Sequence, residues 1–389
     1  MADPISDAPG GSTGQVPSAS PAAGPVTFGE VAAPDTAAYR RMRRLLRNAA
    51  SPASPVTVEE LGRLADVAAF FAACSGQVPP GEIGEAELVV FAAEHGVADR
   101  FRAWHRADAT RRLAETLAAG ASPTTVFAEA AGCRVRLVDV ALRGTVDGVD
   151  AGERVRNGCG FIDVEDAMTA EEYAAALELG RDLADEAVDR GCGVLSTAVL
   201  GVGAETAALA VLGTITRTEP VTIFGFGATG TDDRRWSRNV TVLRDAMFRA
   251  REVADSVGDV LRIAGGCDLV AAAGFIAQAA VRRTPVILDT TASAVAAVCA
   301  DALAPGAREW LLAGRLTPAP AHLLALRRLG LQALFAMNAP LGLGTAALQT
   351  LPVARAAARI ASGCELPEPE GPGEPEESGE PGGPDPPGP

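Results

Sequence analysis

The sequence has few of the residues that build metal centres and disulfide frameworks. Its 389 residues include three histidines, at positions 95, 105 and 322, and seven dispersed cysteines without a C-x-x-C pair. Zinc sites need clustered histidine and cysteine, and disulfide frameworks need paired cysteines in an oxidising compartment. We therefore expect no metal site, no cofactor, and the reduced thiols of a cytoplasmic protein.

Signals for export and for membrane insertion are also lacking. The N-terminus has no basic stretch followed by an apolar one, so we expect no secretory signal. The longest weakly charged run, residues 192–215, is interrupted by Glu205 and by a G-x-G turn. This pattern favours a buried strand followed by a helix over a membrane span.

Aromatic residues are scarce and the charge is mostly of one sign. Aromatics make up 4% of the chain against 48% hydrophobic residues, so the core must be built largely from Ala, Val and Leu. The net charge of −15 disfavours general binding to nucleic acid, so we expect no nucleic-acid partner. Eight acids follow Cys364 without a basic residue among them, which leaves −7 for residues 1–364 (−15 plus eight).

Composition divides the chain into four stretches. Residues 1–36 are rich in Pro, Gly, Ser and Ala, and the acidic Pro/Gly/Glu tail 365–389 is similar, so both are predicted to be disordered. Residues 37–54 form a basic helix and linker with five arginines between Arg40 and Arg47. That helix is either a solvated first helix or a docking helix for an acidic partner. Residues 55–364 form the folded domain.

Within the folded domain, short apolar segments alternate with long amphipathic ones. Strands are predicted within 86–96, 133–142, 192–203, 219–233 and 284–291, and helices over 169–191, 205–215, 240–257 and 292–303. Thr169 suits the N-cap of the first of these helices. The alternation predicts an α/β fold, a mostly parallel sheet flanked by helices in a Rossmann-like three-layer arrangement.

Three glycine turns follow predicted strands or precede predicted helices. They are Gly201-Val202-Gly203, the run from Gly225 to Gly230, and Gly342-Leu343-Gly344 ahead of a helix. Each turn either packs the backbone closely or offers free N–H groups to a phosphate. The carboxyl ends of parallel strands meet at one edge of the sheet, so we expect the turns to converge on one crevice.

The second turn matches the G-x-G-x-x-G dinucleotide pattern by letters alone. A dinucleotide site needs a following strand that ends in an acid about twenty residues on. Asp245 instead falls within a helical pattern, so we interpret this turn and Arg238 as a phosphate clasp.

Taken in order, these segments resemble the nicotinate-nucleotide:dimethylbenzimidazole phosphoribosyltransferases. The likeness runs from about Leu61 to Ile360 and includes LVVFAAEHGVAD, DAMTAEEYAAALELG, GFGATGTDDRRW, AGGCDLVAAAGFIAQAAVRRTPVILDTTAS and GLGTAALQTLP. The resemblance implies a larger α/β domain, a smaller helical domain from the chain ends, and a homodimer. It also implies transfer of phosphoribose from nicotinate mononucleotide to a benzimidazole-type base, the activation of the cobalamin lower ligand.

The resemblance carries over a set of substrate-binding positions. These are Gly201, Gly203, Gly225, Gly227, Gly230, Arg238, Asp289, Thr317, Gly342 and Gly344. Arg238 stands where the family commonly has lysine, and arginine supplies the same charge with a different donor geometry.

Two acidic positions of the family are apolar in this chain. Leu343 stands in place of the catalytic glutamate and Val199 in place of a second one. Loss of a general base raises the barrier by roughly 3–5 kcal/mol, which predicts slow turnover or a pseudoenzyme. Three side chains near the predicted site offer replacements, namely Glu94, His95 and Glu205, although His95 also suits loop orientation and Glu205 suits a helix N-terminus.

Three functions remain open from the sequence. The first is the family's transfer reaction, with nicotinate mononucleotide and a benzimidazole-like base as partners. The second is a catalytically degenerate homologue that binds nucleotide, or that forms a heterodimer with an active paralogue instead of a homodimer. The third is an adaptor that acts through the arginine-rich helix and the acidic tail.

Overall fold

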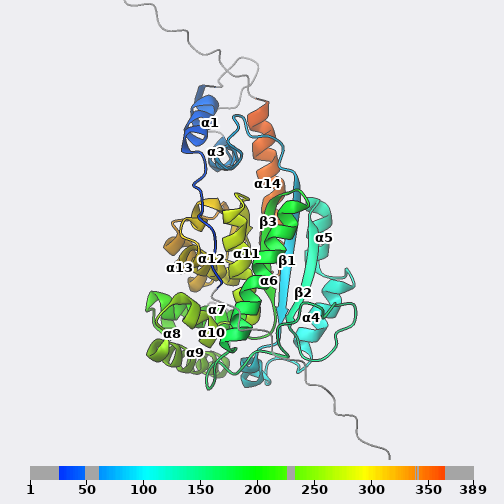
Figure 1. Cartoon of the computed structure of the whole chain (residues 1–389), viewed down its shortest axis with the longest axis vertical. Helices are drawn as coiled ribbons and strands as arrows, with labels where there is room; N and C mark the ends of the chain where they lie inside the picture. Colours follow the sequence, from blue (N-terminus) through cyan, green and yellow to red (C-terminus); the bar gives the residue numbers. More distant parts are fainter. Residues whose placement is uncertain (1–25, 49–60, 226–232, 338, 340, 364–389) are drawn as a thin grey trace, which may run out of the picture. The chain divides into compact units, whose positions relative to one another are not determined.

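The computed structural model describes residues 26–48, 61–225, 233–337, 339 and 341–363 (Figure 1). The chain divides into two compact units. The larger unit comprises Met1–Pro34 and Ile83–Val353, and the smaller comprises Asp35–Glu82 and Ala354–Pro389. The smaller unit is thus assembled from segments near the two chain ends, as the resemblance implied.

A five-stranded parallel sheet organises the larger unit. Its strands are β1 Glu85–Ala93, β2 Arg134–Ala141, β3 Cys192–Leu200, β4 Val286–Leu288 and β5 Leu311–Ala313. They lie in the order β2-β1-β3-β4-β5, and each neighbouring pair is parallel. A separate parallel pair joins β6 Arg315–Leu316 to β7 Phe335–Ala336. The predicted α/β class with a parallel sheet is confirmed.

Helices cover the sheet on both sides. In Figure 1, α6 and α11 lie to one side of β1 and β2, and α4 and α5 lie to the other. The helical segments of the larger unit are η1 Gly96–Phe101, α4 Ala109–Ala118, α5 Pro123–Ala131, α6 Ala170–Asp189, α7 Ala204–Thr216, α8 Pro220–Phe224, α9 Asp233–Val253, α10 Val257–Ala264, α11 Cys267–Val281, α12 Thr291–Leu303, η2 Ala307–Trp310 and α13 Pro320–Leu329. Helix α14, Thr345–Ser362, begins in the larger unit.

The pairing of α6 with α11 shows how small residues shape the core. Thr169 caps α6 in a reciprocal capping box with Glu172, as its sequence predicts. A Cβ at Gly180 would lie 1.9 Å from the carbonyl oxygen of Ala271, and one at Gly274 would lie 2.5 Å from that of Leu177. The two helices therefore approach backbone to backbone, which larger side chains would prevent.

One predicted strand is wrong. The segment within 219–233 begins as the short helix α8, Pro220–Phe224, and not as a strand. Pro220 occupies the first helical turn, where its fixed φ and missing N–H suit a helix start. A short apolar run such as VTIF fits a buried helix as well as a strand, and periodicity alone does not separate the two.

The smaller unit contains the arginine-rich helix. Helices α1, Thr36–Asn48, and α3, Arg63–Ser75, contact each other, and α1 buries its apolar face, Ala38, Met42, Leu45 and Leu46. On α1, Arg40, Arg41, Arg44 and Arg47 are exposed, whereas Arg43 pairs with Asp66 at 2.6 Å.

The disorder predicted for residues 1–36 is corrected from residue 26 onward. Val26, Phe28 and Val31 pack against the core of the larger unit, and the Trp310 indole donates to the Ala32 carbonyl at 2.9 Å. Apolar side chains interspersed among Pro and Gly are enough to fix this stretch. Residues 1–25 and the acidic tail lie outside the described residues. None of the described helices combines the length and apolar composition that a bilayer crossing needs.

Candidate functional site

The loops that follow β3, β4 and β5 meet at the carboxyl edge of the sheet, where parallel α/β sheets bind ligands. They enclose a space of about 610 Å³, which we call the central cavity. Its walls are Leu113, Ala198, Val199, Gly201, Ala204, Glu205, Leu209, Ile223, Phe224, Asp289, Thr290, Thr291, Ala292, Ser293, Thr317, Pro318, Ala319, Ala321, Gly342 and Leu343. The first and third glycine turns therefore converge, as predicted.

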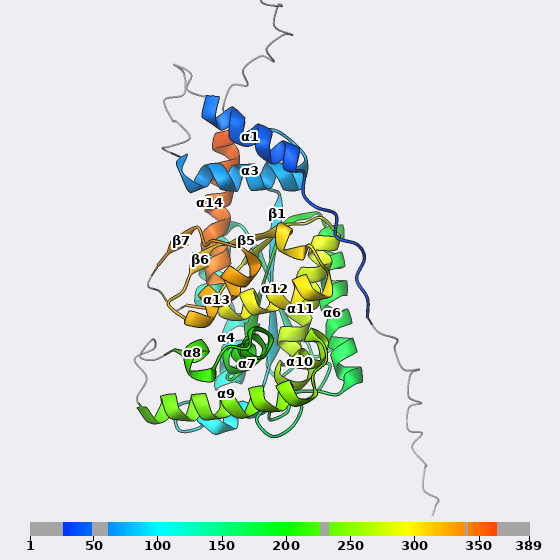
Figure 2. The same cartoon turned by 90° about the vertical axis from the view of Figure 1, so that its left-hand side faces the viewer.

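Three helices point their N-termini at the central cavity. Helices α7, α12 and α13 begin after Gly203, Thr290 and Ala319, and none of these three residues makes a side-chain capping hydrogen bond. Figure 2 shows α12 and α13 side by side above α7 and α8. Some of the first N–H groups of these helices are already engaged. That of Ala204 donates to the Gly201 carbonyl at 3.3 Å. That of His322 donates to the Ala319 carbonyl at 3.0 Å, and Pro320 has no N–H. The dipoles of the three helices still add positive potential at their starts. The cavity is therefore suited to an anion.

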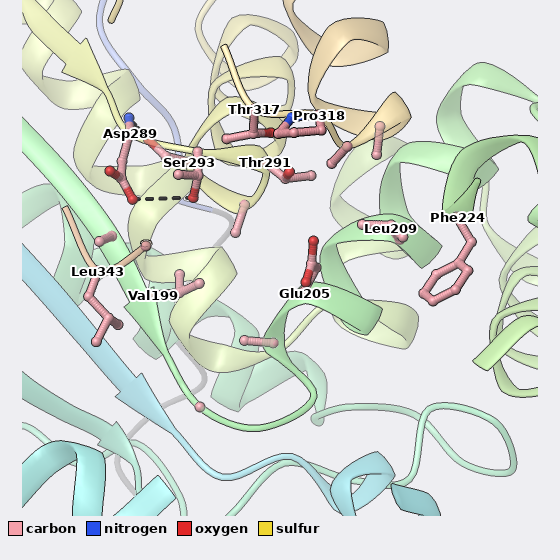
Figure 3. Close-up of a pocket in the computed structure, with 18 of the residues that line it drawn as sticks. Val199, Glu205, Leu209, Phe224, Asp289, Thr291, Ser293, Thr317, Pro318 and Leu343 are labelled. Carbon is pink, nitrogen blue, oxygen red and sulfur yellow. Dashed lines mark hydrogen bonds between the residues drawn. The ribbon is translucent and has the colours of Figure 1, made fainter. Parts of the chain in front are cut away.

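Hydroxyl groups line the wall formed by α12 and the loop before α13. Thr291, Ser293 and Thr317 all face the central cavity (Figure 3). The backbone N–H of Thr317 donates to Nδ1 of buried His322 at 3.1 Å, and its hydroxyl lies 2.9 Å from the same atom. Burial, with the Arg315 charge, lowers the pKa of His322 to about 4. The ring is thus neutral and holds Thr317 in place.

Asp289 fastens the third glycine turn to this wall. Its carboxylate accepts the backbone N–H groups of Gly344 at 3.0 Å and Ala346 at 2.8 Å, and the Thr290 hydroxyl at 3.2 Å. Burial raises the pKa of Asp289, while these hydrogen bonds oppose the rise. The side chain caps the start of α14, so the residue predicted to bind substrate also positions the turn that carries Leu343.

The two apolar residues at which the resemblance implies glutamates face the same space. Leu343 and Val199 both line the central cavity, and Figure 3 shows Leu343 beneath Asp289. Leu343 has a left-handed φ of 56°, and its carbonyl accepts the Thr124 hydroxyl at 2.8 Å. The turn thus delivers a hydrocarbon side chain to the cavity.

Glu205 projects into the central cavity from the first turn of α7. Figure 3 shows its carboxylate in the space between Val199, Thr291 and Leu209. The residue is exposed, but its carboxyl group stands in a recess of the protein. Desolvation by the surrounding atoms raises the pKa of Glu205, and the Arg235 charge opposes the rise. A carboxyl group of this kind is a frequent feature of catalytic sites.

A second space adjoins the first and is rich in cationic side chains. This arginine cavity of about 660 Å³ is lined by Phe101, His105, Arg106, Ala109, Arg112, Leu113, Thr116, Gly201, Val202, Gly203, Glu205, Thr206, Leu209, Phe224, Arg235, Asn239 and Leu243. Leu113, Gly201, Glu205, Leu209 and Phe224 line both spaces. Glu205 therefore stands at the boundary between a hydroxyl-lined space and a basic one.

The predicted binding residues divide into three groups. Gly201, Asp289, Thr317 and Gly342 line the central cavity, and Gly203 lines the arginine cavity. Gly225 ends α8, where its carbonyl accepts the Trp236 indole at 2.8 Å, and Gly344 is buried against Leu88. Gly227 and Gly230 lie outside the described residues.

Arg238 is exposed on α9 in a shallow hollow with Asp233, Arg234, Ser237 and Thr241. Its Nε donates to the Arg100 carbonyl at 3.4 Å. Since part of the second glycine turn is not described, the predicted clasp with Arg238 stays a prediction.

Packing explains two of the glycines directly. A Cβ at Gly201 would lie 2.1 Å from the Ala93 carbonyl oxygen. Gly203 has a φ of 97°, and a Cβ at Gly203 would lie 2.8 Å from the Val97 side chain. At Gly201 the close neighbour is a backbone carbonyl, which does not yield, and at Gly203 the left-handed φ itself disfavours a larger residue. Close packing and ligand access are therefore not alternatives at this turn.

Arg235, Thr291 and Ser293 line these cavities without having been among the residues that the sequence predicts. Arg235 lies one turn before Arg238 on α9 and faces the arginine cavity instead of the exposed hollow. Helical spacing alone does not say which of two arginines three residues apart faces inward. The hydroxyls of DTTAS after a predicted strand were a usable signal, since such residues favour helix starts.

Glu94 and His95 face elsewhere. Both line a small cavity of about 60 Å³, and Leu343 is not among the residues that line it. The buried His95 ring lies 3.1 Å from the Asp268 carboxylate, which raises its pKa to about 9 against the opposing effect of burial. His95 is thus a structural partner of Asp268. In the described part of the chain, no three His, Cys, Asp or Glu side chains come together to hold a metal ion.

Comparison with known proteins also finds relatives whose names indicate a phosphorylated ligand. The family model described as phosphoribosyltransferase matches residues 31–368. A nicotinate-nucleotide–dimethylbenzimidazole phosphoribosyltransferase of Corynebacterium efficiens is 44% identical over 330 residues, 85% of this chain and 87% of the relative. The enzyme of the same name from Mycobacterium ulcerans is 40% identical over 333 residues, 85% of this chain and 91% of the relative.

A solved structure agrees. The crystal structure of CobT from Thermus thermophilus superposes with a TM-score of 0.77 at 32% identity, covering 84% of this chain and 96% of that one. The match extends over most of the folded chain in sequence and in backbone. This chain therefore belongs to the nicotinate-nucleotide–dimethylbenzimidazole phosphoribosyltransferase family.

Proposed function

We propose that this chain binds nicotinate mononucleotide in the central cavity and transfers its phosphoribosyl group to a ring nitrogen of a benzimidazole-type base. One observation carries the proposal: the uncapped N-termini of α7, α12 and α13 converge on one hydroxyl-lined space. Unpaired N–H groups at helix starts are a favoured binding site for phosphate. The family relatives supply the identity of the nucleotide and of the acceptor.

The wall formed by Thr291, Ser293 and Thr317 is the proposed phosphate subsite. Hydroxyl groups add directional donors to the helix N–H groups, and His322 fixes the orientation of Thr317. The buried guanidinium of Arg315 lies close enough to lower the pKa of His322, so it adds positive potential behind this wall. A phosphate held here leaves the ribose toward Glu205 and the arginine cavity.

Release of nicotinate tests the transfer. Purified chain with nicotinate mononucleotide and dimethylbenzimidazole is expected to release nicotinate, and release should depend on the azole. Thr317→Val keeps the side-chain shape and removes the hydroxyl, so we expect about tenfold weaker binding of the mononucleotide in calorimetry. Unchanged affinity in that variant would move the phosphate to another wall.

The alternative function is a catalytically degenerate homologue that binds nucleotide or pairs with an active paralogue. Leu343 favours it, since a hydrocarbon at the family's glutamate position accepts no proton. A native chain that binds nicotinate mononucleotide but releases no nicotinate supports this alternative. Activity that appears only after Leu343→Glu would establish the native chain as a pseudoenzyme with an intact fold.

A further inference from the structure

The reaction proposed above requires a proton acceptor near the incoming azole. A benzimidazole attacks through one ring nitrogen and must lose the proton on the other, and a positioned base typically contributes about 10²–10⁴ in rate. In this family that acceptor is expected at position 343, where this chain has leucine. A working site therefore needs a carboxylate elsewhere on the same cavity.

Two carboxylates line the central cavity, and one is already engaged. Asp289 accepts two backbone N–H groups at the start of α14 and the Thr290 hydroxyl, so it holds the turn in place. Glu205 is on α7, across the cavity from Asp289, and its carboxylate lies in the open space of the cavity (Figure 3). Among the residues the structure describes, Glu205 is the carboxylate that also lines the arginine cavity.

Two contacts and one constrained dihedral angle fix the backbone before Glu205. Gly201 packs against the Ala93 carbonyl, and the Val202 N–H donates to the Thr110 hydroxyl at 3.0 Å. Gly203 then takes a left-handed φ of 97° and begins α7. Glu205 is the second residue of that helix, so its direction is set by a turn with little freedom to move. A catalytic group needs this kind of fixed support.

The surroundings of Glu205 also suit proton transfer. Desolvation by the surrounding atoms raises the pKa of this carboxyl group above its ordinary value, and Arg235 moderates the rise. A carboxylate with a raised pKa is a stronger proton acceptor than one with the ordinary value. The N-terminus of α7 still favours the ionised form, which must be present before the azole binds.

We propose that Glu205 is the general base of this chain and replaces the acid missing at position 343. The inference rests on the proposed function, because it assumes the transfer to an azole. An azole in the arginine cavity attacks the anomeric carbon of nicotinate mononucleotide with the lone pair of one ring nitrogen. The bond from that carbon to the pyridine nitrogen breaks, and its electron pair leaves with nicotinate. The proton on the second azole nitrogen passes to the Glu205 carboxylate and then to solvent.

Substitution of Glu205 tests the role directly. Glu205→Gln keeps the size of the side chain and removes the proton acceptor, so nicotinate release should fall about 10²–10⁴-fold. The affinity for nicotinate mononucleotide, measured by calorimetry, should be at least that of the native chain, since a negative charge has been removed. Glu219→Gln, an exposed glutamate before α8, is the matched control and should keep native turnover.

A double variant separates a missing base from a damaged site. Leu343→Glu added to Glu205→Gln places a carboxylate on the opposite wall and should restore at least tenfold of the lost rate. Native turnover in Glu205→Gln overturns the role of Glu205 and leaves the proposed function standing. A native chain that releases no nicotinate with any azole overturns both, and the two failures are told apart by whether the unaltered protein turns over.

Discussion

Two G-x-G turns border the central cavity, and they differ both in backbone and in the side chain that faces the cavity. The middle residue of the second turn, Leu343, has a left-handed φ of 56°, whereas Val202 in the first turn has no positive φ. Gly201-Val202-Gly203 begins α7, and Gly342-Leu343-Gly344 begins α14. In both, the last glycine has a left-handed φ, 97° and 85°, and a Cβ there would strike a neighbouring side chain, Val97 or Leu88. Glu205, in the helix that follows the first turn, faces the cavity, whereas in the second turn the middle residue Leu343 faces it.

The comparison teaches that the packing of a glycine turn does not determine which side chain faces the cavity. What the turns share is the last glycine, whose left-handed φ and close neighbours do not depend on whether an acid stands nearby. A carboxylate at position 205 and a carboxylate at position 343 would face the same cavity from different walls.

The largest expected effect concerns the backbone of the first turn. Gly201→Ala should lower the free energy of unfolding by about 3 kcal/mol, because the added Cβ meets a carbonyl oxygen that has no room to shift. Gly342→Ala is the matched variant in the other turn, where nothing lies within 4 Å of the new atom. It should change stability by less than about 0.5 kcal/mol. Urea denaturation of both variants makes the measurement, and equal losses would contradict the packing argument.

The second effect is a pH dependence from His322. Its pKa is about 4 in the folded chain and ordinarily 6.5, so the unfolded chain binds more protons between these pH values. The free energy of unfolding should therefore fall as pH drops from 6.5 toward 4, by up to about 3 kcal/mol. Thermal or urea unfolding across this range measures the slope.

His322→Gln should remove that acid slope and leave the alkaline one. His95 has a folded pKa of about 9, so its contribution is complete below pH 6.5 and is lost as pH rises toward 9. An acid slope that persists in His322→Gln would assign it to other groups.

The third effect concerns the side chain that fastens the second turn. Asp289→Asn keeps the shape but offers one amide oxygen to the two N–H groups of Gly344 and Ala346. We expect a loss of about 2 kcal/mol in unfolding free energy and slower nicotinate release through displacement of the turn. Thr290→Val removes one hydrogen bond to the same carboxylate and serves as the milder comparison. A fully stable Asp289→Asn would show that the start of α14 does not depend on this cap.

The smallest effect distinguishes two arginines on α9. Arg235 faces the arginine cavity and lowers the pKa of Glu205, whereas Arg238 is exposed. With phosphate held at the start of α12, Arg238→Ala should change the affinity for nicotinate mononucleotide by less than about twofold. Calorimetry on Arg235→Ala and Arg238→Ala makes the comparison. A tenfold loss confined to Arg238→Ala would restore the predicted clasp with the second glycine turn.

The sequence indicated much of this site, but it did not indicate which side chains face the cavity. Order along the chain predicted the parallel sheet, the turn at Gly201 and the acid at Asp289, because strand and helix periodicities are local properties. The helix α8 was mistaken for a strand because a short apolar run does not distinguish the two. Arg235 was overlooked in favour of Arg238 because two arginines on one helix differ only in what each faces.

By itself, the sequence determined the family, the alternation of strands and helices, and the absence of an acid at position 343. These follow from residue identity and local periodicity, which do not depend on distant contacts. Only the tertiary structure decided that Glu205, and neither Glu94 nor His95, shares a cavity with Leu343. The physical reason is that a cavity is formed by segments far apart in the chain, and the direction of each side chain is set by the backbone packed behind it.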